Sequence, residues 1–308
     1  MAIRRLAFLS IIVTYLLIVF GGYVASSNSG MGCGPEWPLC NGSVIPILKG
    51  TTLVEFTHRV IGAILGIMTV ILFFKIVRAK VDSNVRRTAW GMLFLLIIQV
   101  LLGAVVVIKD LPAIVVTIHL LIAMLYLFSL VWIWRNSVQE VKHVYSPIND
   151  YSQKLINRHL NILMILLILT LGFGAYIKHQ SYGLACEWLN CRDSLIPVTT
   201  PEILQTLHRF LAIVSTVYIL LLTYKAITKK WGASLQKRLA IVTLLTIFQL
   251  LIGVLTIKTS LNIPWAVLHL AIGTAVFVFV GESKVYLGSI TIKTKLKVSQ
   301  TSQHQSLE

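Results

Sequence analysis

Apolar residues in this chain are gathered into long runs separated by short polar segments. Eight of these runs are long enough to cross the ~30 Å hydrocarbon core of a bilayer as a helix. The predicted spans are roughly 6–25, 52–77, 88–108, 113–134, 157–178, 202–224, 236–257 and 263–282. The first run is too long for a signal peptide and has no small-residue cleavage site, so we interpret it as a spanning helix. The pattern predicts an all-α polytopic membrane protein with eight transmembrane helices.

The composition supports the same class. Of the 308 residues, 56% are hydrophobic and only 12% are charged, and the mean hydropathy is +0.83. Because the apolar runs account for most of the chain, no soluble domain of useful size is expected. We therefore expect one membrane domain, and the repeat described below divides it into two similar halves.

Lysine and arginine are concentrated in alternate connections between the apolar runs. The basic side holds Arg4, Arg5, Lys75, Arg78, Lys80, Arg86, Arg87, Arg135, Lys142, Lys154, Arg158, Lys225, Lys229, Lys230, Lys237, Arg238, Lys284, Lys293, Lys295 and Lys297. The other side holds only Lys49, Lys109, Lys178, Arg192 and Lys258. Because basic loops stay on the cytoplasmic side, this asymmetry predicts a cell-membrane protein with both termini cytoplasmic. It also accounts for the net charge of +16, together with anionic membrane lipid, and no aromatic–basic patch indicates a nucleic-acid partner.

Four histidines form two pairs that repeat at a constant offset. His58 and His119 are 61 residues apart, as are His208 and His269, and adding 150 to the first pair gives the second. Each lies five to seven residues from the predicted outer end of its span, up to ~10 Å along a helix. A lone histidine of this kind is usually a hydrogen-bonded core residue, but intramembrane ionisable groups are costly and tend to be functional. Four at one depth favour two bis-histidine units, each able to ligate one haem-like macrocycle.

Several neighbours of the histidines repeat at the same offset. Adding 150 relates Gln99 to Gln249, Gly103 to Gly253 and Arg59 to Arg209. In each Q-x-x-x-G pair the glycine lets helix backbones approach and the amide can bond across helices, so we interpret these pairs mainly as packing, with contact to a macrocycle as the lesser alternative. Arg59 and Arg209 directly follow a histidine near the outer surface. They could bind propionate groups or extend to lipid headgroups, and the sequence favours neither.

The two halves differ at one informative position. Three residues before the first histidine of each half stands a polar residue, Glu55 in the first half and Gln205 in the second. An i, i+3 spacing puts this residue on the same helix face as the histidine. We favour a role for Glu55 in proton transfer, and the alternative is an ion pair with Arg59 or Lys49. The first site is thus predicted to perform chemistry and the second to hold a permanent electron-transfer cofactor.

All four cysteines lie in predicted outer loops. Cys33 and Cys40 follow the first span, and Cys186 and Cys191 follow the fifth. Two cysteines in each of two outer loops is the distribution expected of disulfides in an oxidising compartment, and short loops favour pairing within each loop. The bonds could have only a structural role in closing the loops, which is the interpretation we favour, or the Cys33–Cys40 pair could be redox-active. A metal site is disfavoured because each loop offers only two sulfurs.

A combination of motifs resembles the haem A synthase family over residues 1 to about 284. The resemblance rests on CGPEWPLC at 33–40, E-x-x-H-R at 55–59, H-R at 208–209, the two Q-x-x-x-G pairs, His119 and His269. Each motif alone is weak, but the combination is highly specific. Members of this family convert haem O to haem A, which serves terminal oxidases.

The resemblance implies a fold and different roles for the two halves. The fold would be two four-helix bundles related by a pseudo-two-fold axis: residues 1–140 with the substrate site and residues 141–284 with the haem b site, followed by a cytoplasmic tail at 285–308. His58 and His119 would hold haem O, and His208 and His269 would hold haem b as the cofactor. Glu55 matches the family's catalytic carboxylate. Cys33 and Cys40 match the cysteines of its disulfide-bearing branch, and the role of Cys186–Cys191 is less defined because that loop is short.

The implied reaction oxidises the C8 methyl of haem O to a formyl group in two successive two-electron steps. Implied partners are haem O as substrate, membrane lipid, a haem O synthase (protohaem farnesyltransferase) and an electron acceptor. The main alternative is a quinol-linked cytochrome that binds two haem b groups and changes neither. A quinone-linked thiol oxidoreductase would need a C-x-x-C pair at a helix end, which the sequence lacks, and a haem transporter is a weaker alternative.

Overall fold

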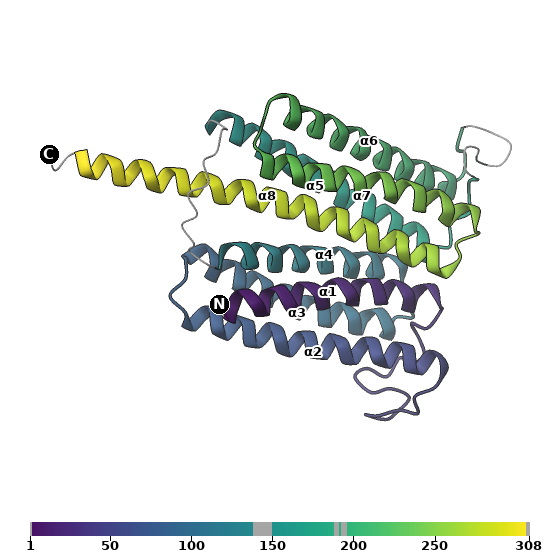
Figure 1. The fold of residues 1–308 in the computed structure, drawn as a ribbon. Coiled ribbons are helices and arrows are strands. Elements are labelled where there is room, and N and C mark those ends of the chain that lie inside the picture. Colours follow the sequence, from purple (N-terminus) through teal and green to yellow (C-terminus); the bar gives the residue numbers. More distant parts are fainter. Residues whose placement is uncertain (1, 138–149, 188–190, 192–195, 306–308) are drawn as a thin grey trace.

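The computed structural model describes residues 2–137, 150–187, 191 and 196–305, and within these residues the regular structure is entirely helical (Figure 1). The helices are α1 (Ala2–Ser26), α2 (Gly50–Arg78), α3 (Ser83–Ile108), α4 (Ala113–Asn136), α5 (Asp150–His179), α6 (Thr200–Thr228), α7 (Ala233–Lys258) and α8 (Ile263–Gln305). Each contains one predicted span and is long and apolar enough to cross a membrane. The chain is therefore a multi-pass membrane protein of the predicted all-α class.

Helix α8 is longer than the sequence analysis suggested. The helix runs from Ile263 to Gln305, so it continues beyond the predicted span at 263–282 and through most of the predicted tail at 285–308. No proline or glycine follows Gly288, so the sequence contains no residue that would stop the helix. The predicted boundary between the halves, at 140/141, lies outside the described residues.

The helices pack as two groups of four, α1–α4 and α5–α8 (Figure 1). In the first group α1 and α3 each contact both α2 and α4, and in the second α5 and α7 each contact both α6 and α8. The groups meet where α4 contacts α5 and α8, and where α1 contacts α8. The second group thus repeats the helix order and contacts of the first.

The turns between helices also repeat. Asp110 and Leu111, between α3 and α4, have φ of 56° and 57°, and Ser260 and Leu261, between α7 and α8, have φ of 53° and 62°. Two successive left-handed residues are unusual outside glycine, so the same uncommon turn closes both helical pairs. It sets the level at which α4 and α8 begin, and therefore the level of His119 and His269.

The packed apolar core of the first group lies at the end where α1 begins and α2 ends. Leu72, Met92, Leu130 and Ile133 are completely buried there. At the same end Glu282 of α8 pairs with Arg135 of α4 and, at 2.8 Å, with Arg238 of α7, which ties the two groups together. The disulfide loops lie at the opposite end, called here the disulfide end, where the histidine-bearing helices α2, α4, α6 and α8 all begin (Figure 1).

The predicted orientation gives a direct test. Reporter fusions after Lys80 and Lys230 are expected to be cytoplasmic, and a fusion near Gly42 is expected to be outside, because basic residues concentrate at the connections between α2 and α3 and between α6 and α7. The measurement is a pair of reporters, one active only in the cytoplasm and one only outside. A cytoplasmic Gly42 would reverse the orientation and remove the reason to expect an oxidising environment for the cysteines.

Candidate functional site

The structure brings the predicted histidines together in two pairs. His58 extends from α2 and His119 from α4, and the two side chains lie near each other in the first half. His208 and His269, on α6 and α8, stand in the same relation in the second half. All four lie within three turns of the disulfide end of their helices, so each half contains one bis-histidine pair at that level.

A glycine on a neighbouring helix faces each imidazole. A Cβ built on Gly21 would lie 3.1 Å from His58, and one on Gly103 would lie 3.3 Å from His119. The corresponding distances are 2.8 Å from Gly174 to His208 and 3.0 Å from Gly253 to His269. These distances are shorter than ordinary van der Waals contact, so a larger residue at any of the four positions would push the imidazole away. Gly103 and Gly253 were predicted as packing positions, whereas Gly21 and Gly174 were not singled out.

The predicted glutamines bond across helices, as the Q-x-x-x-G pattern indicated. The Gln99 side-chain amide lies 3.1 Å from Nε2 of His119. In the second half the Gln249 amide lies 3.4 Å from Nε2 of His269. Each glutamine thus orients the late histidine of its half.

Buried polar atoms without a partner occur at matching places in both halves. Among the described residues, Nδ1 of His119 and Oε1 of Gln99 make no hydrogen bond, and neither do Nδ1 of His269 and Oε1 of Gln249. Such groups are rare in native proteins and call for an explanation. An imidazole nitrogen without a protein partner suits a metal ligand, and each half offers such an imidazole beside a second one. These residues therefore fit a metallated macrocycle that needs only two axial ligands from the protein.

His208 is oriented by a backbone group instead. Its Nδ1 lies 3.0 Å from the carbonyl oxygen of Thr170 on α5. If Nδ1 donates to this carbonyl, Nε2 carries the lone pair and can bind a metal, which is how most metal-binding histidines are held. The role of Thr170 cannot be predicted from the sequence, because it contributes a backbone carbonyl, which every residue has.

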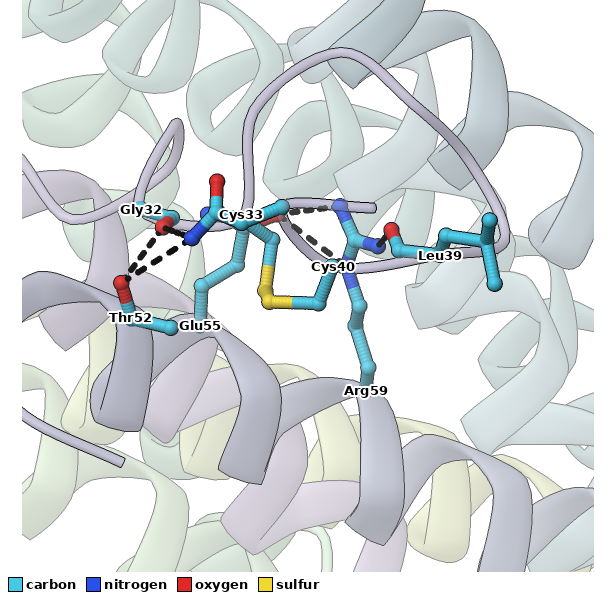
Figure 2. A network of polar contacts seen from close by, with 8 residues as sticks. Gly32, Cys33, Leu39, Cys40, Thr52, Glu55 and Arg59 are labelled. Carbon is cyan, nitrogen blue, oxygen red and sulfur yellow. Dashed lines mark hydrogen bonds and ion pairs between the residues drawn. A yellow bond between two sulfur atoms is a disulfide. The ribbon is translucent and has the colours of Figure 1, made fainter. Parts of the chain in front are cut away.

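Glu55 lies under the first disulfide loop, as Figure 2 shows, and is only 4% exposed. Its Oε2 accepts a hydrogen bond from the backbone N–H of Cys33 at 2.8 Å. Its Oε1 accepts from Nη2 and Nε of Arg59 at 2.6 and 3.1 Å. The ion pair with Arg59 was the alternative interpretation of this residue. The contact holds the carboxylate in one orientation on the helix turn that carries His58.

Gln205 makes the corresponding contact in the second half. Its Oε1 accepts from the backbone N–H of Cys186 at 2.6 Å, and its Nε2 donates to the carbonyl of Gly183 at 2.7 Å. In both halves, therefore, the side chain three residues before the histidine binds the amide of the first cysteine in the disulfide loop. The difference between the halves is the chemistry of the contact, which is a carboxylate in one and an amide in the other.

The arginines that follow the histidines also bind the disulfide loops. Nη1 of Arg59 donates to the carbonyl of Leu39 at 2.9 Å (Figure 2). Nη2 of Arg209 donates to the carbonyl of Glu187 at 2.7 Å and to that of Cys186 at 3.3 Å. Both arginines thus stay at the disulfide end and help to hold the loops down. Their contact with propionates remains a prediction.

This arrangement can be compared with known proteins. The family model described as cytochrome oxidase assembly protein, COX15-CtaA, matches residues 4–51 and 47–280, which include both histidine pairs. The chain belongs to the COX15-CtaA family. A relative in Symbiobacterium thermophilum named "Heme A synthase" is 30% identical over 233 residues, which cover 73% of this chain and 76% of that protein. Relatives of the same name in Bacillus licheniformis and Staphylococcus haemolyticus are 27% and 28% identical and cover 87% and 89% of this chain, and 90% and 92% of their own lengths.

In this COX15-CtaA family member the cysteines pair within their loops, as predicted. Cys33 is bonded to Cys40 and Cys186 to Cys191, and all four side chains are buried. The first loop is further fixed to α2 by Thr52, whose hydroxyl donates to the carbonyl of Gly32 at 2.7 Å (Figure 2). The first bond thus holds in place the N–H group that Glu55 binds.

Removal of the first disulfide is expected to lower stability and to leave the folded protein active. The bond closes a loop with a sequence separation of seven residues, so the loss from Cys33→Ala with Cys40→Ala is about 2.5 kcal/mol in the chain-entropy treatment. Thermal unfolding followed by turnover of the folded fraction measures both quantities. Complete loss of turnover in folded protein that retains its haem would instead assign the pair a part in electron or proton transfer.

Proposed function

We propose that this protein is a haem A synthase, which oxidises the C8 methyl of haem O to a formyl group in two successive steps. The single observation that carries the proposal is a pair of matching bis-histidine sites in which Glu55 of one corresponds to Gln205 of the other. Two sites that held identical electron carriers would need no such difference. Relatives named "Heme A synthase" support the same assignment.

In the first half, His58 and His119 hold the substrate haem O at the disulfide end. Glu55 sits one turn from His58 on the same helix, and three of its hydrogen bonds fix its direction. A carboxylate offers about four acceptor positions, so one remains for a proton released as the methyl group is oxidised. Arg59 and the Cys33 amide are positioning groups in this step.

In the second half, His208 and His269 hold haem b. When bound there, haem b supplies one-electron transfer between the first half and an external acceptor. Thr170 and Gln249 orient the two imidazoles, and Gln205 cannot serve as a base because its amide does not ionise at physiological pH. This half therefore holds the cofactor without altering it.

With water as the source of oxygen, conversion of a ring methyl to a formyl group removes four electrons in two pairs, releases four protons and adds one oxygen atom. The steps proceed through the alcohol and a hydrated aldehyde, which loses water. The reaction thus needs an electron acceptor, and the apolar substrate is delivered within the membrane by a haem O synthase (protohaem farnesyltransferase). We place the protein in the cell membrane with both termini in the cytoplasm, so the sites lie in the outer half of the bilayer.

The proposal is tested by extraction of pigments from membranes that contain this protein together with a source of haem O. A formyl-bearing haem, identified by mass and by its pyridine haemochromogen spectrum, is the expected product. Membranes with the His119→Ala variant are the matched control and should accumulate haem O. Unaltered haem O with the wild-type protein, together with two tightly bound haem b groups, would instead indicate an electron-transfer cytochrome.

A further inference from the structure

Three buried hydroxyl groups meet in the interior of the first half. They belong to Thr14 of α1, Thr69 of α2 and Tyr126 of α4, which are 2%, 0% and 2% exposed. The Tyr126 hydroxyl makes a short hydrogen bond with the Thr69 hydroxyl, and the Thr14 hydroxyl lies close to it. Polar groups in a transmembrane interior are seldom placed there without a partner or a purpose.

The hydrogen bonds within this cluster leave acceptor capacity on Tyr126. Thr69 donates its proton to the carbonyl of Leu65 at 2.7 Å, and Thr14 donates to that of Ser10 at 2.6 Å. Neither threonine proton is therefore directed at the phenol, so Tyr126 donates to Thr69 and keeps its own lone pairs for another donor. A ligand hydroxyl could fill that place.

The second half replaces every member of the cluster with an apolar residue. Adding 150 turns Thr69 and Tyr126 into Ile219 and Val276, and the offset of 153 that relates Gly21 to Gly174 turns Thr14 into Leu167. Ile219, Val276 and Leu167 are all buried in the apolar core. The second half does bury hydroxyls, such as that of Thr223, but this one bonds to the Thr243 hydroxyl at 2.8 Å and lies at another position. The hydroxyl cluster is thus a difference between two halves that otherwise match.

Helix α2 carries glycine, with no side chain, at two positions between the histidine level and this cluster. His58, Gly62 and Thr69 lie on one face of the helix, and Gly66 lies beside it. A Cβ on Gly66 would meet nothing within 4 Å, and one on Gly62 would meet only Leu17, at 3.9 Å. The matching residues of α6 are Ala212 and Thr216, so side chains occupy these two positions in the second half.

The depth of Tyr126 suits a group attached to a macrocycle at His119. Tyr126 follows His119 by seven residues on α4, which is two turns, or ~10 Å, on the same face. Long side chains in helices lean toward the N-terminus, and α4 begins at the disulfide end. The Tyr126 phenol, which lies farther from the disulfide end than the histidines do, therefore extends toward their level.

We infer that Tyr126, Thr69 and Thr14, reached along Gly62 and Gly66, bind the hydroxyl-bearing side chain of the substrate and make the first half selective for haem O. This inference rests on the proposed function. Haem O carries a long apolar side chain with a hydroxyl group next to the ring, and haem b has a small vinyl group in its place. The half with glycines and hydroxyls takes the larger, hydroxylated macrocycle. The half with Ala212, Thr216, Ile219 and Val276 takes haem b.

The test measures binding of each haem to the first site, independently of turnover. Purified protein that retains its second-half haem is titrated with haem O and with haem b, and binding that is lost in His119→Ala is assigned to the first site. Tyr126→Phe removes only the hydroxyl. It is expected to lower the affinity for haem O about fivefold to tenfold, the value of one net hydrogen bond, and to leave the affinity for haem b unchanged. Gly66→Thr, which introduces the residue that the second half has at this position, is expected to lower the affinity for haem O more than the affinity for haem b.

Thr223→Val is the matched control, because it removes a buried hydroxyl of the second half and should leave the ratio of the two affinities unchanged. Retained second-half haem shows that each variant has folded. An affinity ratio within twofold of wild type in both Tyr126→Phe and Gly66→Thr would overturn the inference. Conversion of haem O by the wild-type protein would still uphold the proposed function in that case. A wild-type protein that neither prefers nor converts haem O would refute the proposed function itself.

Discussion

Alanine at His208 or His269 is expected to remove the tightly held haem from the purified protein. Alanine at His58 or His119 is expected to abolish haem A formation and to leave most of that haem in place. The reason is that each pair belongs to a separate group of four helices, with its own orienting glutamine and its own facing glycines. Haem content by pyridine haemochromogen, measured beside product formation, separates the two outcomes.

The control for these variants is His159→Ala. His159 is another histidine within a span, but it bonds to the Tyr218 hydroxyl at 2.6 Å and belongs to neither pair. Its replacement should change neither haem content nor product. Equal loss of bound haem from all four paired-histidine variants would show that the halves are not specialised, and would contradict the assignment of substrate and cofactor to different halves.

Much of this architecture could be predicted because the membrane imposes simple rules. A span needs about 20 apolar residues, so the eight helices are visible in hydropathy alone. The pairing of His58 with His119 could be predicted because both stand at one depth on helices that run in the same direction. The disulfides could be predicted because two short loops each contain two cysteines.

The supporting contacts of the site could not be predicted in the same way. Gly21 and Gly174 face imidazoles from other helices, but helical glycines are common in membrane proteins, and only helix packing reveals which ones face a ligand. Thr170 and Cys33 contribute backbone atoms, which any residue could supply. The sequence indicated that Glu55 could reach Arg59, but not that its carboxylate also binds a loop amide.

The link between loop and helix gives the disulfides a physical role. A short closed loop presents the N–H of its first cysteine in a fixed direction, and Glu55 or Gln205 accepts from it. The helix turn that carries His58 or His208 is thereby anchored to the loop above it. Because the second half keeps this anchor without a charge, anchoring alone does not require a carboxylate at position 55.

Glu55→Gln is therefore expected to fold and to lose most of its activity. Glutamine at this position can still accept from the Cys33 amide, as Gln205 does from Cys186, and it keeps nearly the same volume. The substitution removes the negative charge that pairs with Arg59 and that can accept a proton, and proton transfer by a placed group is typically worth ~10²–10⁴ in rate. Haem A formation should fall by that factor, while haem O binding and the spectrum of the second-half haem change little.

Two further variants separate proton transfer from anchoring. Glu55→Asp keeps the carboxylate on a shorter side chain and is expected to retain part of the activity. Arg59→Gln keeps Glu55 and removes its ion-pair partner, so it is expected to affect turnover less than Glu55→Gln does, because Arg59 only positions the carboxylate. If Glu55→Gln turned over at near the wild-type rate, Glu55 would be a loop anchor equivalent to Gln205, and the proton acceptor would have to be sought elsewhere in the first half.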